Sequence, residues 1–293
     1  MHRRWISRIL ALVLFGVPSL ALAQDSTPSP MVHGFNYFTF KNDYITPRGL
    51  LVTNKGLTIQ AVNGLAANMY HSAEGPLDDI NFVTGIFNDI NPGNNNSAVW
   101  NELDAFMGLN FNLYKDWLFG MQYVAFISPK ANAFETEHNL EFTLGYNDGG
   151  RWLAPISIKP YAKLFFTAGG GSTVVLGQVP SFDVELGGVP TWDLHLYDVP
   201  VSLTMPTWIT VGPSNFWGGS NNFGVFSTGI NAKIPLESVP SRFGEWSVNI
   251  GVQYYNLINS QLRNAQEVIG VVAPGSNGYR NVFVFAAGFG FHF

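Results

Sequence analysis

The chain has 293 residues, of which 12% are charged and 15% are aromatic, and its formal net charge is −5. The charged fraction is about half the ~25% that soluble domains usually carry, and the acidic balance argues against nucleic acid as a partner. The sequence contains no cysteine, which excludes a disulfide framework, a thiolate metal site and a lipid anchor on cysteine.

The first 23 residues have the pattern of a secretory signal peptide. Three arginines precede a short apolar core at 9–17, and Ala21 and Ala23 fit the small-x-small rule for cleavage. We predict cleavage after Ala23, with an uncleaved anchor as the alternative. Cleavage removes three of the 15 Lys and Arg and no acid, so the mature chain carries a net charge of about −8. Residues 24–30 are expected to be a short flexible leader, and residues 31–293 a single barrel domain.

No apolar stretch of 18 or more residues follows this segment, so we expect no transmembrane helix. An exported, hydrophobic chain without such a helix is either a secreted β protein or a β-barrel of an outer membrane. Only helices and closed barrels satisfy all of their backbone groups in lipid.

Several segments alternate with period two, as strands with two different faces do. In 100–114, Leu103 and Met107 share one face while Glu102 and Asp104 share the other, and Phe106 is an exception. Each such run has about ten residues, the length that a tilted strand needs to cross a bilayer. The clearest runs are 100–114, 117–129, 137–148, 156–168, 245–258 and 281–293; weaker ones are 32–46, 56–70, 79–91, 173–187, 200–211 and 223–235.

These runs predict an all-β, antiparallel up-and-down barrel of about twelve strands. Ten to fourteen strands are compatible with the pattern, because four prolines fall between residues 170 and 215 and proline is poorly tolerated inside a ladder. The tight turn at 114–116 is expected on the periplasmic side, together with both chain ends. The Asn-, Gly- and Ser-rich linkers 90–99, 212–222 and 259–280 are expected outside the cell. The connection 236–245 is longer than a periplasmic turn usually is.

The last thirteen residues, NVFVFAAGFGFHF, place one ring after another on a single strand face. Phe285, Ala287, Phe289, Phe291 and Phe293 alternate with small residues up to the end. This strand resembles the terminal strand of Gram-negative outer-membrane β-barrel proteins. The resemblance implies location in the bacterial outer membrane, contact with its lipid, and recognition of Phe289, Phe291 and Phe293 by the barrel assembly machinery. It does not identify a subfamily.

A secreted β-sandwich with the rings in its core is the alternative fold. A sandwich also alternates, but it needs a well-charged outer surface for solubility. The ring-free faces of this chain carry Gly, Asn, Ser, Thr and Gln more than Lys and Glu. This composition favours the lining of a barrel, in which small residues make room.

Seven charged residues are candidates for the barrel lining. If the bore holds water, they create a field that selects polar solutes; if it does not, they form a plug of mutually satisfied ion pairs, and the sequence leaves both open. Twelve strands leave a smaller bore than sixteen, and an inward loop could close it. The candidates are Glu102, Asp104, Glu141, Lys159, Lys163, Asp183 and Glu185.

The sequence therefore predicts a passive channel for small polar solutes that is not an enzyme. The alternatives are a non-conducting structural or surface-binding barrel and an outer-membrane lipid hydrolase, for which Ser72 and Ser220 are the candidate nucleophiles. No two histidines have metal-ligand spacing, and the glycine-rich 168–173 lacks the lysine of a phosphate loop. We expect no cofactor and no metal, and the oligomeric state is not predicted.

Overall fold

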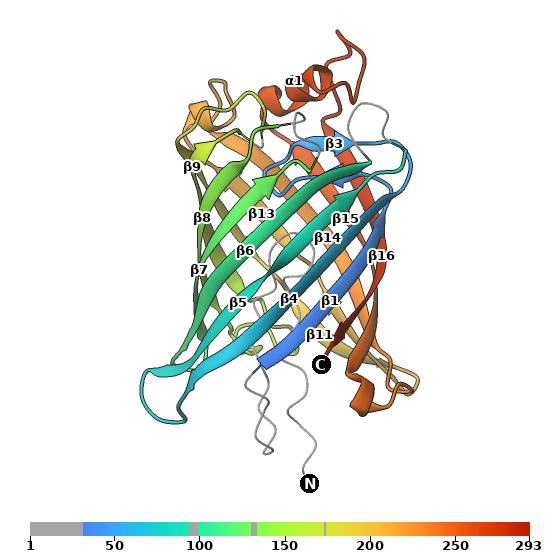
Figure 1. Cartoon of the computed structure of the whole chain (residues 1–293). Helices are drawn as coiled ribbons and strands as arrows, with labels where there is room; N and C mark the ends of the chain where they lie inside the picture. The colour runs from blue at the N-terminus through green and yellow to red at the C-terminus, as the bar shows by residue number, and fades with distance from the viewer. Residues whose placement is uncertain (1–31, 94–98, 130–133, 173) are drawn as a thin grey trace.

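The computed structural model describes residues 32–93, 99–129, 134–172 and 174–293. Within this part, twelve antiparallel strands close into one barrel (Figure 1). This confirms the predicted fold class and strand number. The strands of the wall are β1 (Val32–Lys41), β4 (Thr58–His71), β5 (Leu77–Ile90), β6 (Trp100–Leu113), β7 (Trp117–Ile127), β8 (Glu137–Tyr146), β9 (Pro160–Gly170), β10 (Ser181–Gly188), β13 (Thr207–Val211), β14 (Phe223–Pro235), β15 (Glu245–Leu257) and β16 (Asn281–His292).

The ring closes because β1 pairs with β16 on one side and with β4 on the other. Gly34 and Phe293 exchange two backbone hydrogen bonds, with N···O distances of 2.8 and 3.0 Å. The start of β1 and the C-terminal residue therefore lie at one end of the barrel, here called the terminal end, and the opposite end is called the loop end (Figure 1). The expected grouping is confirmed for the described residues: the strand ends that flank linker 90–99 and the linkers 212–222 and 259–280 share the loop end, and the turn 114–116 lies at the terminal end.

The phenyl rings of the C-terminal strand point outwards. Phe283, Phe285 and Phe289 are exposed, whereas Val282 and Val284 are buried in the interior. Outward rings also pack against their neighbours across β1, β16 and β15, with centroid distances of 5.1 Å for Phe38–Phe289, 4.6 Å for Trp246–Phe291 and 5.0 Å for Tyr254–Phe283. The secreted sandwich with these rings in its core is therefore wrong.

Small residues of the wall make room for large side chains that point inwards. Phe106, the exception in the alternation of β6, lies over Gly85 of the neighbouring β5. A Cβ at Gly85 would come within 2.6 Å of the Phe106 ring. Tyr37 of β1 lies over Gly290 of β16 in the same way, at 2.5 Å. A glycine at the facing position thus lets a ring fill the barrel interior without displacing the strand.

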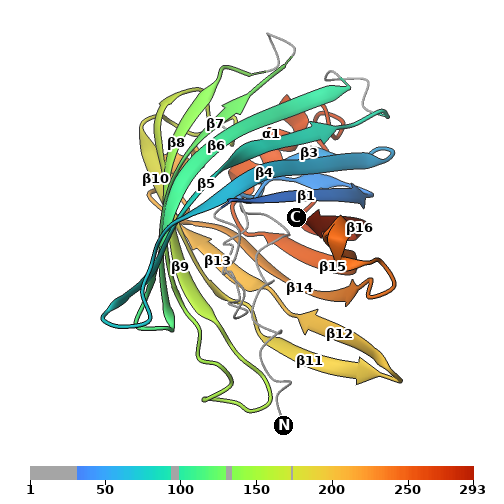
Figure 2. The ribbon, with the colours of Figure 1, turned by 60° about the horizontal axis from the view of Figure 1, so that its bottom comes forward.

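The region with four prolines departs from the expected strands. Where one strand was expected over 200–211, the structure has β12 (Val199–Thr204) and β13, and a further strand β11 (Thr191–Leu196) pairs with β12. The β11–β12 hairpin pairs with the terminal half of β14, beyond the short β13, and extends the terminal end (Figure 2). Pro206 separates β12 from β13 because a proline cannot donate to the ladder.

The turn 147–159 at the terminal end is organised by one carboxylate. Oδ1 of Asp148 accepts hydrogen bonds from the Ser157 hydroxyl (2.8 Å) and from the N–H groups of Ile158 (2.7 Å) and Lys159 (3.1 Å). Burial acts to raise the pKa of Asp148, but these hydrogen bonds together lower it below its ordinary value of 3.8. Lys159 was expected inside a strand starting at 156. It lies instead in this turn, with a φ of 50°, and β9 begins after it.

Two connections at the loop end have structure of their own. Residues 42–57, here called the inward hairpin, contain the short strands β2 (Tyr44–Ile45) and β3 (Leu51–Thr53). The last connection contains the helix α1 (Ser260–Val268), and the short 3₁₀ helices are η1 (Ser214–Phe216) and η2 (Ser241–Phe243). In the described part of the chain no helix is long and apolar enough to cross a membrane.

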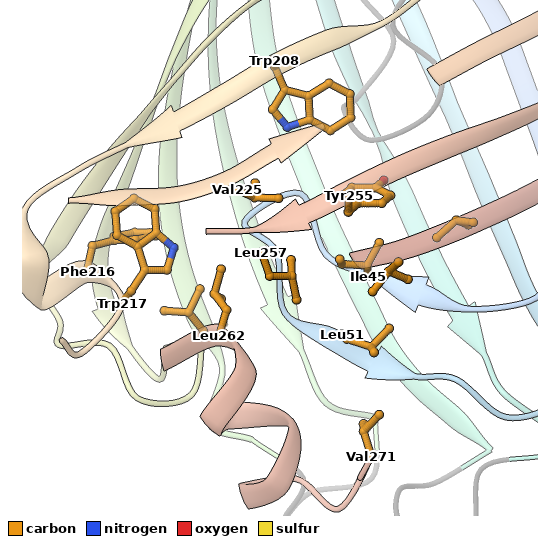
Figure 3. Close-up of a cluster of buried hydrophobic side chains, with 13 residues drawn as sticks. Ile45, Leu51, Trp208, Phe216, Trp217, Val225, Tyr255, Leu257, Leu262 and Val271 are labelled. Carbon is orange, nitrogen blue, oxygen red and sulfur yellow. The ribbon is translucent and has the colours of Figure 1, made fainter. Parts of the chain in front are cut away.

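The inward hairpin, α1 and the wall meet in an apolar cluster inside the loop end (Figure 3). Ile45 and Leu51 of the hairpin and Leu262 of α1 are each at most 1% exposed. They pack with Tyr255 and Leu257 of β15. Burial of each such side chain contributes about 1.5–3 kcal/mol, so the hairpin is a packed part of the interior. The predicted signal peptide, its cleavage site at Ala21 and Ala23, and the leader 24–30 lie outside the described residues.

Candidate functional site in the barrel interior

The tip of the inward hairpin is a tight turn that carries Arg48 into the barrel. Thr46 O accepts a hydrogen bond from Gly49 N at 2.9 Å, which makes Thr46–Gly49 a β-turn. Pro47 occupies the second position of this turn, where its fixed φ is favoured, and Gly49 has a φ of 92°. The Thr46 hydroxyl also accepts the Leu50 N–H at 3.1 Å. The turn fixes Arg48 at the end of the hairpin, where only 1% of its surface is exposed.

The guanidinium of Arg48 lies among acids and rings of the wall. Its Nε is 3.6 Å from Asp183 Oδ1, its Nη2 is 3.8 Å from Glu141 Oε1, and Nη2 donates a hydrogen bond to Asn139 Oδ1 at 3.3 Å. Its Cζ lies 4.4 Å from the centroid of the Phe165 ring and 5.2 Å from that of Phe126. Two carboxylates, an amide and two ring faces thus surround one cation. We call Phe126, Asn139, Glu141, Phe165 and Asp183 the Arg48 cage.

A second cation lies at the edge of the Arg48 cage. Lys163 Nζ is 2.9 Å from Glu141 Oε2 and 4.3 Å from the centroid of Phe165. Glu141 therefore lies between Lys163 and Arg48 and contacts both. Removing one member of such a buried network costs about 3–5 kcal/mol, because an uncompensated charge remains. Nearby, Glu185 accepts a hydrogen bond from the Tyr161 hydroxyl at 2.6 Å.

The start of the inward hairpin is anchored to other carboxylates at the loop end. Tyr44 donates its hydroxyl to Glu102 Oε2 at 2.6 Å. Burial, followed by the field of Glu102, raises the pKa of Tyr44 well above its ordinary value, so the phenol stays a donor. Asp104 follows Glu102 on the same interior face of β6, and its Oδ1 is buried without a hydrogen bond from a described residue.

The buried charges of the wall strands and the inward hairpin are unbalanced. Among the described residues of these elements that are buried, seven are acidic and three are basic. The buried part of the barrel interior is therefore acidic overall. The acids are Asp89, Glu102, Asp104, Glu137, Glu141, Asp183 and Glu185, and the bases are Lys41, Arg48 and Lys163.

The structure brings together six of the seven lining candidates that the sequence suggested, and Lys159 is the one that it places elsewhere, in a turn. Arg48, Tyr44 and Lys41 were not among the candidates. The signal for Arg48 was present in the sequence: ITPRGLLV has a turn motif between apolar residues, and loops exposed to water are rarely so apolar.

The terminal half of the interior has a different lining. Its inward residues include Asn110 and Asn112 of β6, Thr143 of β8, Asn231 of β14 and Asn249 of β15, all half-buried. Gly288 and His292 of β16 continue this wall, and His292 Nε2 lies 2.7 Å from the Tyr37 hydroxyl. Small polar groups therefore line part of the terminal half, beside the buried rings of Phe35 and Tyr37 and beside Lys233, which shares the inward face of Asn231.

The hydrolase candidates do not form a triad. His71 Nδ1 lies 2.7 Å from Asp79 Oδ1 at the terminal end, but the adjacent Ser72 donates its hydroxyl to Glu74 O at 2.7 Å. Ser220 lies in a loop at the opposite end of the barrel. His138 stacks on Tyr123 on the outer face.

No protein-family model and no curated protein matches the sequence. Nineteen solved chains match the fold. The outer-membrane phospholipase A from Escherichia coli has 12% identity and a TM-score of 0.42, covering 88% of this chain and 92% of its own. An outer-membrane channel from Pseudomonas putida F1 has 10% identity and a TM-score of 0.40, covering 89% and 95%.

The translocator domain of the autotransporter NalP from Neisseria meningitidis has 11% identity and a TM-score of 0.42, covering 92% of this chain and 90% of its own. These three solved structures are Gram-negative outer-membrane β-barrels. They differ in activity and identify no subfamily.

Proposed function

We propose that this chain is an outer-membrane channel for small polar solutes and that the described form is its closed state. The observation that carries the proposal is the contrast between the two halves of the interior. The terminal half has small polar groups on β6, β8, β14 and β15 beside the buried rings of Phe35 and Tyr37, whereas the inward hairpin and α1 pack inside the loop end. In this proposal the loop end faces the outside of the cell and the outward rings contact lipid. The last three alternating phenylalanines, Phe289, Phe291 and Phe293, serve as the assembly signal.

The attachment of the inward hairpin supports the proposal that this hairpin is a movable gate. The hairpin leaves the wall at Lys41 and returns at Thr58, and these two residues are paired neighbours in β1 and β4. It can therefore withdraw without breaking a hydrogen bond between wall strands. Arg48 is its most buried charged residue, and the cage residues are the part of the wall that contacts it.

Conductance in a planar bilayer tests this function. We expect the Arg48→Ala variant to open more often or to a higher conductance than the native chain, because the ion pairs and ring contacts of the hairpin tip are lost. Lys55→Ala is the matched control: it removes the same charge from the same hairpin at an exposed position. If Arg48→Ala conducts no more than Lys55→Ala, Arg48 does not hold a gate.

The apolar cluster at the loop end favours a second candidate, a non-conducting barrel. Ile45, Leu51 and Leu262 bury the hairpin against α1 and the wall, and this packing stabilises a permanently closed form. The outcome that supports this candidate is the absence of conductance from the native chain, from Arg48→Ala and from a variant that lacks residues 43–56.

A lipid hydrolase is the third candidate. The pair of His71 and Asp79 beside Ser72 favours it, but the Ser72 hydroxyl donates its hydrogen bond to Glu74 O. Release of fatty acid from vesicles that is lost in Ser72→Ala or in Ser220→Ala would establish it in place of the channel.

A further inference from the structure

We propose that the Arg48 cage is a binding site for solutes that carry a guanidinium or a primary ammonium group, and that Arg48 occupies it as an internal substitute. The role of such solutes as cargo rests on the proposed channel function. The binding site itself rests on the geometry of the wall.

Every residue of the cage belongs to the wall. Phe126 is on β7, Asn139 and Glu141 are on β8, Phe165 is on β9 and Asp183 is on β10. These strands are consecutive neighbours in the ring, and their register does not depend on the inward hairpin. When the hairpin withdraws, the acids and ring faces therefore remain in place.

The cage has the chemistry that recognises an organic cation. A guanidinium is planar and weakly hydrated, and it stacks on aromatic faces while its N–H groups meet carboxylates. Phe165 and Phe126 supply the faces, and Glu141 and Asp183 supply the charge. Small inorganic cations keep their water shell and gain little from ring faces. Lys163 already neutralises part of the charge of Glu141, so the cage fits a single positive charge.

Arg48 leaves part of the cage unused. Asp183 is 0% exposed, and neither of its oxygens accepts a hydrogen bond from a described residue. Its contact with Arg48 is an ion pair at 3.6 Å, longer than a charge-assisted hydrogen bond. The short turn at the hairpin tip determines where the guanidinium lies. A free solute is not held by that turn and can approach Asp183 at hydrogen-bond distance.

Calorimetric titration of the purified barrel in detergent with ethylguanidinium tests the site. Because Arg48 competes for the cage, we expect the Arg48→Ala variant to bind at least about tenfold more tightly than the native chain. Lys55→Ala should bind as the native chain does. Arg48→Gln keeps most of the side-chain stem and serves if the alanine variant does not fold. Sodium chloride of equal ionic strength is the reference for each titration.

Substitutions of cage residues show whether ethylguanidinium binds at the cage. In the Arg48→Ala background, Asp183→Asn and Phe165→Leu should each weaken the binding of ethylguanidinium. Absence of binding in both Arg48 variants, or equal binding in Arg48→Ala and Lys55→Ala, overturns the site. Binding without conductance leaves the site standing and removes the channel function, whereas conductance without binding removes the site alone.

Discussion

Two buried residues of this barrel, Arg48 and Asp148, each contact several polar or aromatic partners at once. Arg48 joins two carboxylates, an amide and two rings, and Asp148 joins three donors of one turn. In both cases the partners are distant in sequence or belong to an irregular segment. Each of these residues therefore contributes more to the free energy of unfolding than an ordinary surface ion pair, which contributes about 0–1 kcal/mol.

The hydrogen bonds of Asp148 predict how its substitution changes stability. We expect Asp148→Asn to lower the free energy of unfolding by about 1–3 kcal/mol, because hydrogen bonds to a charged acceptor are lost. The pKa of Asp148 is lowered in the folded state, so its contribution is present above pH ~4 and is lost as the pH falls through the folded pKa. The difference between native and variant chains should thus be constant from neutral pH down to about pH 5 and shrink below pH ~4.

Urea unfolding followed by tryptophan fluorescence at several pH values measures this difference. Asp198→Asn is the control, because Asp198 is an exposed carboxylate in another turn of the terminal end. A difference that persists unchanged at pH 3 would contradict the role assigned to the charge of Asp148.

At the scale of elements, regular strands were predictable and irregular connections were not. Ten of the twelve wall strands follow from alternation, because one face meets the interior and the other lies outside. The other two begin later than the runs expected from 173 and 200, β10 at Ser181 and β13 at Thr207. The inward hairpin was missed because its two strands have two and three residues, too few to show a period. The β11–β12 hairpin was missed because prolines obscured where one strand ended and the next began.

The helix α1 was also not predicted, and its stability depends on contacts that a linear pattern does not show. Asn259 caps it by accepting the Gln261 N–H at 2.9 Å. The amide of the same side chain donates to Asn221 O at 2.9 Å and to Phe223 O at 3.2 Å. The cap therefore ties the helix to the neighbouring loop 212–222. A sequence pattern rich in Asn, Gly and Ser indicates a loop and does not reveal such a cap.

The cap formed by Asn259 predicts how its loss changes the stability of α1. We expect Asn259→Ala to destabilise α1 by about 1 kcal/mol, within the ~0.5–2 kcal/mol typical of lost N-caps. Hydrogen exchange of the amides of 260–268 should become roughly five times faster. Asn264→Ala, in the same helix and exposed, is the control. Equal acceleration in both variants would show that Asn259 has no special role as a cap.

For the whole molecule, charge and lining decide which ions would pass through the proposed channel in its open state. Seven buried acids of the wall face three buried bases of the wall and the inward hairpin, and Arg48→Ala removes one of the bases. A net acidic constriction attracts cations and repels anions. The candidate site was predictable as a group of charges on interior faces, because parity assigns each residue to a face. Parity could not find its central member, Arg48, since parity does not apply to a turn; only the apolar residues around that turn indicated it.

We therefore expect the open Arg48→Ala barrel to prefer cations. The reversal potential in a salt gradient measures this preference, which should weaken in 1 M salt, where the Debye length falls to ~3 Å. Adding Glu141→Gln should reduce the preference, while Lys55→Ala alone should not change its sign. A preference for anions in the Arg48→Ala barrel would contradict the acidic lining.

Residues 42–57 are attached to two paired neighbours of the wall, Lys41 and Thr58. This attachment separates the passage of solutes from the folding of the barrel. In the proposed channel, substitutions within this segment change how readily solutes pass and leave the ladder of the wall strands intact. The permeability of such a channel can thus diverge between related chains while the barrel stays the same.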